Sequence, residues 1–264
     1  MDNLLKIRGL KVNFYIGAQV ITAVDGLDLD IGCKEVVVLA GESGSGKTVS
    51  ALAVTRILPA NARVEAGSII FSGRDLLSID EQALRAVRGK DISYVFQEPA
   101  SYLNPVYTIG GQIQEAVRLH QKTTKQVAAA ETLRLLEEVK ITDPRRVASS
   151  YPHQLSGGMN QRALIAMSLA SCPKLLIADE PTTALDVTIE AEILALLTTL
   201  KSKLGFSLLF ITHNLSIARR IADRVAVMYR GKMVEEAPSQ DIFKDPKHFH
   251  TKELISAYEK IGRI

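Results

Sequence analysis

Residues 41 to 48 read GESGSGKT and fit the pattern GxxxxGK[ST] at every fixed position. The pattern follows an apolar run and precedes a segment rich in Ala, Leu and Val, which is the strand and helix context that this motif requires. Its glycines let backbone N–H groups turn inward, and a helix start near Lys47 adds the positive end of its dipole. Lys47 would meet the β- and γ-phosphates of a nucleotide, and the Thr48 hydroxyl would ligate Mg²⁺. The alternative, a glycine-rich turn without a ligand, is disfavoured by this context.

Two further apolar runs end in residues that could act on a phosphate. In LLIADE (175–180), Asp179 can reach a Mg²⁺ shell, and Glu180 is placed to accept a proton from an attacking water. Paired acids after a strand are by themselves more often a helix start or a solvated turn, but the phosphate loop reverses that preference. His213 ends the run LLFITH; a lone histidine is usually structural, yet at the carboxyl edge of a parallel strand it would face the phosphate site.

A second helix start suited to phosphate lies in LSGGMNQ (155–161), where Ser156, Gly157 and Gly158 precede a helical run. The plainer interpretation is a helix cap with glycines for close packing. Because only one loop of the chain carries the lysine, this second start suggests a site for the nucleotide of another molecule.

The elements that must position these residues alternate along the chain. The first ninety residues are predicted as β segments with turns, interrupted by a helix from about Lys47 to Leu58 that Pro59 closes. Residues 98–150 show mostly helical spacing, and strands and helices alternate again from KLLIAD onward. This order predicts an α/β fold with a mostly parallel sheet and a helical insertion.

Composition narrows the class of protein. No run of the 264 residues approaches the roughly 18 apolar residues of a membrane-spanning helix, and the N-terminus lacks a secretory signal, so we expect residence in the cytosol. The net charge of +3 comes from scattered, nearly balanced charges and does not indicate a nucleic-acid surface. Cys33 and Cys172 are expected to be buried free thiols.

Six motifs in order carry a resemblance to a known family: GESGSGKT, Gln97 in VFQEP, LSGGM, LLIADEP, ALD at 184–186, and His213. Together they resemble the ATP-binding subunits of ABC transporters along nearly the whole chain. In that family the motifs are the Walker A loop, Q-loop, signature, Walker B, D-loop and switch histidine. The stretches YPHQLSGGM and DPKHFHTKELISA are similar to the subfamily that imports oligopeptides, dipeptides and nickel or related metal chelates.

The resemblance implies a single ABC ATPase domain over residues 1–264, with a mostly parallel core sheet, an antiparallel β subdomain and an inserted helical subdomain. Residues 1–97 and 160–240 would form the nucleotide-binding core with its β subdomain. Residues 98–159 would form the helical subdomain with the signature, and 241–264 a helical extension.

It also implies the roles of the site residues. Glu180, His213 and Gln97 would be catalytic, while Thr48, Gln97 and Asp179 would surround Mg²⁺. An aromatic residue would stack on adenine, either Phe14 or Tyr15, with Phe14 preferred from its place after GLKVN. The other expected ATP-binding positions are Gly41, Glu42, Ser43, Gly44, Ser45, Gly46, Lys47, Thr48, Val49 and Gln97, with Ser156, Gly157, Gly158 and Asp186.

The expected function is ATP hydrolysis that energises an importer at the cytoplasmic face of the membrane. Two such subunits, identical or paralogous, would close on two ATPs. The helical segment would contact the membrane permease, and a solute-binding protein would be an indirect partner. The alternative is an ABC-type ATPase that acts on DNA, ribosomes or cluster assembly without a permease. A P-loop GTPase is disfavoured because no NKxD-type segment is present.

Overall fold

The computed structural model of the chain describes residues 3–183 and 185–261. Ala184, the first residue of the ALD motif, lies outside the described residues, as do positions 1–2 and 262–264 at the ends of the predicted domain. The chain divides into two compact units: Met1–Arg85 with Ser207–Ile264, and Ala86–Phe206.

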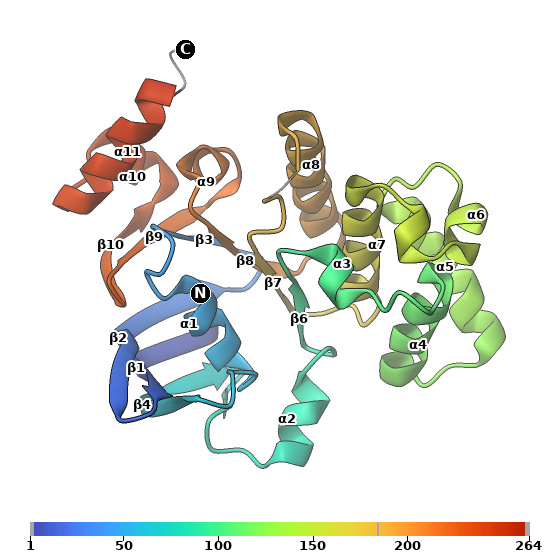
Figure 1. Cartoon of the computed structure of the whole chain (residues 1–264), viewed down its shortest axis with the longest axis horizontal. Helices are drawn as coiled ribbons and strands as arrows, with labels where there is room; N and C mark the ends of the chain where they lie inside the picture. The colour runs from blue at the N-terminus through green and yellow to red at the C-terminus, as the bar shows by residue number, and fades with distance from the viewer. Residues whose placement is uncertain (1–2, 184, 262–264) are drawn as a thin grey trace. The chain divides into compact units, whose positions relative to one another are not determined.

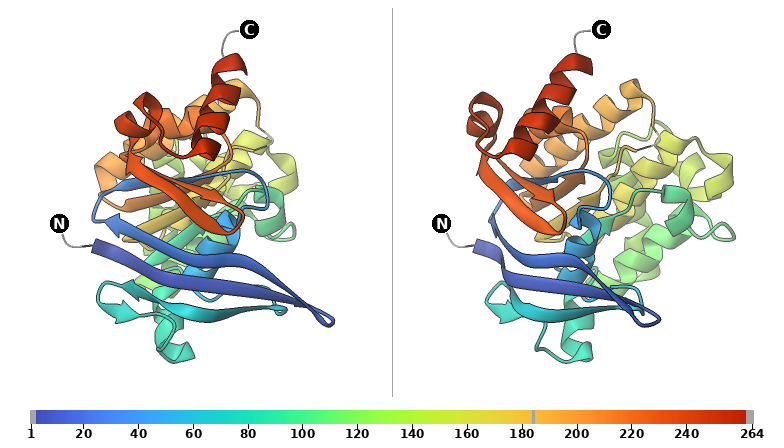
Figure 2. Two further views of the ribbon diagram at one scale, coloured as in Figure 1. Left: turned by 90° about the vertical axis from the view of Figure 1, so that its left-hand side faces the viewer. Right: turned by 60° about the vertical axis from the view of Figure 1, so that its left-hand side comes forward.

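The first unit contains an antiparallel sheet in the order β2-β1-β4-β5, whose long strands lie side by side in Figures 1 and 2. In β2, Leu27, Leu29 and Ile31 are buried, whereas Asp28 is exposed and Asp30 half-buried, as the alternation in the sequence predicts. The strands are β1 (Asn3–Ile16), β2 (Gln19–Gly32), β4 (Ala62–Phe71) and β5 (Arg74–Asp75).

The same unit holds four strands of the core sheet. β3 (Val36–Ala40) is buried along its whole length and pairs in parallel with β8 (Ser207–Thr212) and β9 (Arg224–Tyr229). β10 (Lys232–Pro238) adds an antiparallel edge to β9. The helices of this unit are α1 (Lys47–Val54), α9 (Leu215–Ile221), α10 (Ser239–Lys244) and α11 (Phe249–Ile261), and α2 (Glu81–Val87) crosses into the second unit.

The second unit pairs β6 (Ile92–Val95) in parallel with β7 (Leu175–Asp179) and is otherwise mostly helical. Its helices are α3 (Pro99–Tyr102), α4 (Ile109–Gln121), α5 (Lys125–Glu138), α6 (Pro144–Ser149), α7 (Gly157–Leu169) and α8 (Val187–Leu204), with a 3-10 turn at Pro152–Gln154. The core strands are therefore parallel except for β10, which confirms a mostly parallel core sheet, an antiparallel sheet and a helical subdomain.

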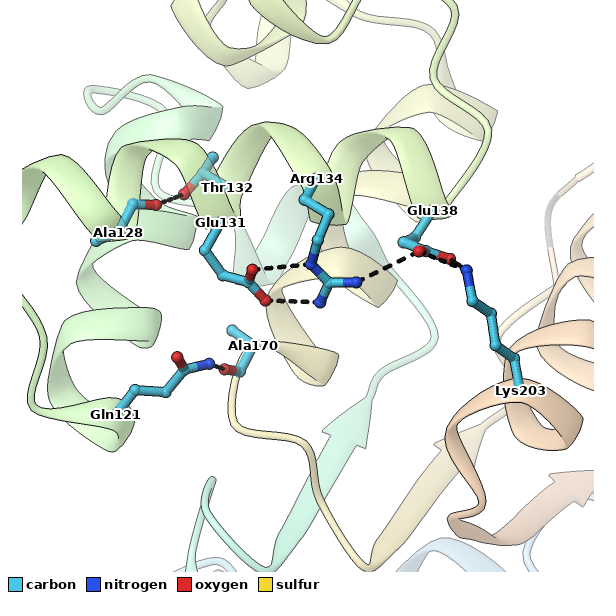
Figure 3. A network of polar contacts seen from close by, with 8 residues as sticks. All are labelled: Gln121, Ala128, Glu131, Thr132, Arg134, Glu138, Ala170 and Lys203. Carbon is cyan, nitrogen blue, oxygen red and sulfur yellow. Dashed lines mark hydrogen bonds and ion pairs between the residues drawn. The ribbon is translucent and has the colours of Figure 1, made fainter.

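A polar network fastens the helical part of this unit to α8 (Figure 3). The Glu131 carboxylate accepts two hydrogen bonds from Arg134, and this contact holds the pKa of Glu131 below its usual range. Arg134 also donates to Glu138, which accepts from Lys203 Nζ at 2.6 and 2.8 Å. These contacts tie the end of α5 to the last turn of α8.

Three expectations about local structure are wrong. The helix predicted for 47–58 ends at Val54, because Arg56 adopts a left-handed backbone (φ 54°) and its guanidinium donates to the Ile79 carbonyl at 2.8 Å. The short helix α2 lies where only strands and turns were predicted. Cys33 and Cys172 are free as expected but exposed, because both lie in connections between elements.

Candidate active site

The glycine-rich loop connects β3 to α1 in the first unit and is enclosed by neighbouring backbone. A Cβ atom on Gly41 would lie 2.3 Å from the Met228 carbonyl oxygen, and one on Gly46 would lie 2.4 Å from that of Ala23. Both glycines also have positive φ, 151° and 102°, so any other residue would be strained as well as crowded. β9 and β2 therefore fix the course of the loop.

Lys47 begins α1 and points back into the loop, with only 4% of the residue exposed. Its Nζ donates to the carbonyl oxygens of Gly41 at 2.8 Å and Glu42 at 2.7 Å. The ammonium group is thus held by the backbone that precedes the helix start, where phosphate would bind. Around it the structure places Glu42, Ser43, Gly44 and Thr48 exposed, Ser45 buried and Val49 half-buried.

His213 lies at the same end of the sheet as this loop, where the strands β3 and β8 end. β3 and β8 pair in parallel with Ala40 opposite Thr212, so Gly41 and His213 each follow directly after a matched pair. Carboxyl ends of neighbouring parallel strands are where α/β sheets bind ligands. The first unit therefore brings together the loop and the exposed histidine, as the sequence predicts.

The two candidate aromatic residues lie on opposite faces of β1. Phe14 is half-buried and pairs with Ala62, so it shares the face of buried Val12. Tyr15 points to the other face, where its hydroxyl donates to Glu65 at 2.5 Å and raises the pKa of the phenol. The guanidinium of Arg63 lies 5.7 Å from the centre of the same ring.

In the second unit, the acidic pair follows β7. Asp179 is the last strand residue and is buried, whereas Glu180 is half-buried with a left-handed backbone (φ 46°). Because Val95 of β6 lies opposite Ala178, Gln97 and Glu180 each stand two residues beyond a matched pair. The structure thus places Gln97, Asp179 and Glu180 at the carboxyl ends of the paired strands β6 and β7.

The signature residues begin α7. Ser156 caps this helix by accepting a hydrogen bond from the Met159 backbone, and Asp186 caps α8 in the same way from Ile189 at 2.9 Å. Ser156, Gly157 and Asp186 are exposed. The first residues of both helices therefore lie at the surface.

Gly158 also serves packing, the plainer of the two roles considered from sequence. A Cβ atom there would lie 3.0 Å from Ile189 Cγ2, so a side chain at residue 158 would force Ile189 to shift by a few tenths of an ångström where the starts of α7 and α8 pack together. Arg162 strengthens the same contact, since it donates to the Glu192 carboxylate at 2.7 Å. Sequence reasoning missed Ile189 and Arg162, because neither belongs to a motif with chemistry of its own.

Comparison with known proteins places the chain in a family. The model of the family described as ABC transporter matches residues 24–183. The chain therefore belongs to the ABC transporter family, as an ATP-binding cassette.

Its relatives include transport proteins of several bacteria. It is 51% identical to the peptidoglycan transport ATP-binding protein YejF of Agrobacterium fabrum, over 97% of this chain and 47% of the relative, so the chain spans about half of that protein. It is 49% identical to a putative peptide import ATP-binding protein of Brucella ovis, over 98% of this chain and 78% of the relative. The dipeptide transport ATP-binding protein DppD of Haemophilus influenzae is 47% identical over 96% of this chain and 76% of the relative.

Solved structures confirm the fold. The dimeric ATP-binding cassette MJ0796 bound to ADP and Pi superposes with a TM-score of 0.79 at 25% identity, covering 93% of this chain and all of that one. CbiO1 from Clostridium perfringens, part of the ABC transporter complex cbiONQ, gives a TM-score of 0.79 at 24% identity, covering 100% of this chain and 98% of that one. Among the residues described here, no helix is long and apolar enough to cross a membrane.

Proposed function

We propose that this chain hydrolyses ATP to energise an ABC importer of peptides, as a peripheral subunit at the cytoplasmic face of the membrane. The observation that carries the proposal is the ordered motif set on a cassette fold, with Lys47 held inside its loop and Asp179 and Glu180 at a strand edge. Relatives named for peptide, dipeptide and glutathione import favour peptides over nickel chelates as cargo.

The chemistry is phosphoryl transfer to water. The water oxygen forms a bond to the γ-phosphorus while the bond to the β–γ bridging oxygen breaks, and a proton of the water passes to Glu180. Lys47 would offset charge on the phosphates, and His213 would face the γ-phosphate. Thr48, Gln97 and Asp179 carry the oxygen donors that Mg²⁺ prefers, and bound Mg²⁺ would neutralise charge that develops on the phosphates.

A second ATPase subunit would complete each site. The exposed helix start at Ser156 and Gly157 supplies N–H groups for the nucleotide of the partner, and Asp186 would lie beside it. The dimeric form of the similar cassette MJ0796 supports this arrangement.

For adenine, the structure favours Phe14. The Tyr15 hydroxyl donates a hydrogen bond to Glu65, and its ring contacts the Arg63 guanidinium. Phe14 instead lies on the same face of β1 as Val12. The neighbouring strand β2, which pairs with Phe14 through Ile21, contacts the glycine-rich loop at Ala23. An aromatic ring on this face would stack on the base of a nucleotide whose phosphates occupy the loop.

Phe14→Ala is expected to weaken ATP affinity about tenfold, because stacking on a base is worth about 1–3 kcal/mol. Tyr15→Ala is expected to leave the affinity within about twofold, since its ring serves the opposite face of the sheet. Titration of both variants with a fluorescent ATP analogue in the presence of Mg²⁺ measures the difference. If Tyr15→Ala alone weakened binding, the assignment of Phe14 would be wrong.

The permease would dock in a groove of about 460 Å³ in the helical subdomain. Tyr102 and Tyr107 line it with Leu119, and their exposed fractions are 49%, 60% and 71%. An exposed apolar cluster of this kind is typical of an interaction surface. The stacked rings of Tyr102 and Phe96, with centroids 4.0 Å apart, connect this groove to the residue before Gln97. Occupancy of the groove can thereby influence the strand edge that carries the Q-loop.

We expect Leu119→Asp to reduce recovery of the permease with this chain at least about fivefold, because a charge would be buried without a partner. Val127→Asp is the matched control: Val127 is also an exposed apolar residue of the helical subdomain, but it lies outside the groove. Co-purification of the complex from detergent-solubilised membranes compares the two, and thermal midpoints confirm that both fold. Recovery without any polytopic membrane protein, even for the unaltered chain, would favour an ATPase that acts without a permease.

A further inference from the structure

The segment after β7 contains a contact that the roles proposed above do not use. The Thr183 hydroxyl donates a hydrogen bond to Glu180 Oε2 at 2.9 Å, and the Thr183 backbone N–H donates to the Glu180 carbonyl at 3.1 Å. One residue therefore holds both the backbone and the carboxylate of Glu180. From the geometry we propose that Thr183 is the positioning residue that orients Glu180 as general base. This proposal rests on the proposed function.

Glu180 gains from such a contact because its conformation is otherwise costly. Its backbone is left-handed (φ 46°), which costs about 1–2 kcal/mol for a residue with a side chain. Its carboxylate is carried on three rotatable bonds, and fixing a side chain of this length costs about 1.5–2 kcal/mol of conformational entropy. A base that is oriented before the substrate binds contributes more to the rate than one that must be ordered during the reaction.

The turn that carries Thr183 is itself anchored. Thr182, of which 4% is exposed, donates to the Glu190 carboxylate of α8 at 3.3 Å, and the Leu185 N–H donates to the Thr182 carbonyl at 3.2 Å. The two adjacent threonines thus have different tasks: Thr182 fastens the turn to α8, and Thr183 holds Glu180. A β-branched side chain suits the second task, because its restricted χ1 keeps the hydroxyl directed at one acceptor.

Three substitutions distinguish a positioning role of Thr183 from a structural one. Thr183→Val keeps the shape of the side chain but removes the donor, so we expect kcat for ATP to fall about tenfold while KM stays within about twofold. Thr183→Ser keeps the hydroxyl and should remain within about threefold of the unaltered chain. Thr182→Val, which removes the neighbouring hydroxyl that contacts Glu190 instead, is the matched control: it affects Glu180 only through the turn, so kcat should stay within about threefold of the unaltered chain while the thermal midpoint falls.

The experiment measures steady-state hydrolysis of Mg-ATP by the full chain and its variants, together with thermal unfolding. In the background of Glu180→Gln, Thr183→Val should have no further effect on the residual rate, because the group that it orients has lost its function. Unchanged kcat in Thr183→Val would overturn the inference, and so would a fall in kcat that Thr183→Ser reproduces. Should Thr183→Val fail to fold, Thr183→Ala tests the same loss of the donor.

The hydrolysis rates of the two variants distinguish failure of the proposed function from failure of the Thr183 assignment. Substantial hydrolysis by Glu180→Gln would mean that Glu180 is not the general base, and the proposed mechanism would be wrong. Loss of hydrolysis in Glu180→Gln with full activity in Thr183→Val would retain Glu180 as the base and remove only the role of Thr183.

Discussion

Glu180→Gln is expected to lower kcat for ATP hydrolysis at least about 100-fold, with ATP affinity retained within about twofold. The change replaces a carboxylate with an amide of nearly equal size, so it removes the proton acceptor and keeps the shape. The amide oxygen can still accept the hydrogen bond of Thr183, and the turn after β7 should persist. Single-turnover hydrolysis and equilibrium ATP binding, measured on the same preparation, separate the two effects.

The matched control is Glu190→Gln, the same acid-to-amide change in the same segment. Glu190 accepts a hydrogen bond from Thr182, which an amide oxygen can also accept. The kcat of Glu190→Gln should stay close to that of the unaltered chain.

Because Glu180→Gln would bind ATP without consuming it, ATP should also produce long-lived dimers of this variant in sedimentation experiments. Rapid hydrolysis by Glu180→Gln would mean that another group accepts the proton.

The motifs could be located from sequence because their chemistry demands fixed spacings. The glycines of residues 41–48 adopt positive φ angles that other residues rarely adopt, and at Gly41 and Gly46 neighbouring backbone also leaves no room for a side chain. Strands such as β3 were recognisable because a strand covered on both faces is apolar throughout. These features depend on local backbone requirements, which are visible in a single sequence.

Other features depend on contacts between distant segments and could not be predicted in this way. The end of α1 is decided by Arg56, whose guanidinium reaches the carbonyl of Ile79, and not by the nearby Pro59. The close contact of Gly158 with Ile189 needs two helix starts to meet. Likewise, the contacts of Tyr15 with Glu65 and Arg63 need β4 to pair with β1, although the opposite faces of Phe14 and Tyr15 follow from strand alternation alone. The sequence gives no sign of a role for Thr183, because its hydrogen bond to the Glu180 carboxylate depends on the turn between them.

Lys47→Ala is expected to weaken ATP affinity about 100-fold, since a charge-assisted hydrogen bond to phosphate is worth about 1.5–3 kcal/mol and Lys47 is expected to contact two phosphates. The loss should be smaller for ADP and smallest for AMP, because the β- and γ-phosphates are the groups that the ammonium meets. Lys6→Ala, which removes an exposed lysine of β1, controls for the change in net charge.

The ratio between the nucleotides matters because Lys47 also supports the loop itself. Its Nζ binds the carbonyl oxygens of Gly41 and Glu42, so its removal can loosen the loop as well as remove a charge. A loosened loop would weaken ATP and ADP by similar factors and lower the thermal midpoint without nucleotide. A missing charge would instead reduce the preference for ATP over ADP. Isothermal titration of the three nucleotides therefore distinguishes direct phosphate binding from support of the loop, and equal affinity of Lys47→Ala and the unaltered chain for ATP would contradict the phosphate-loop assignment.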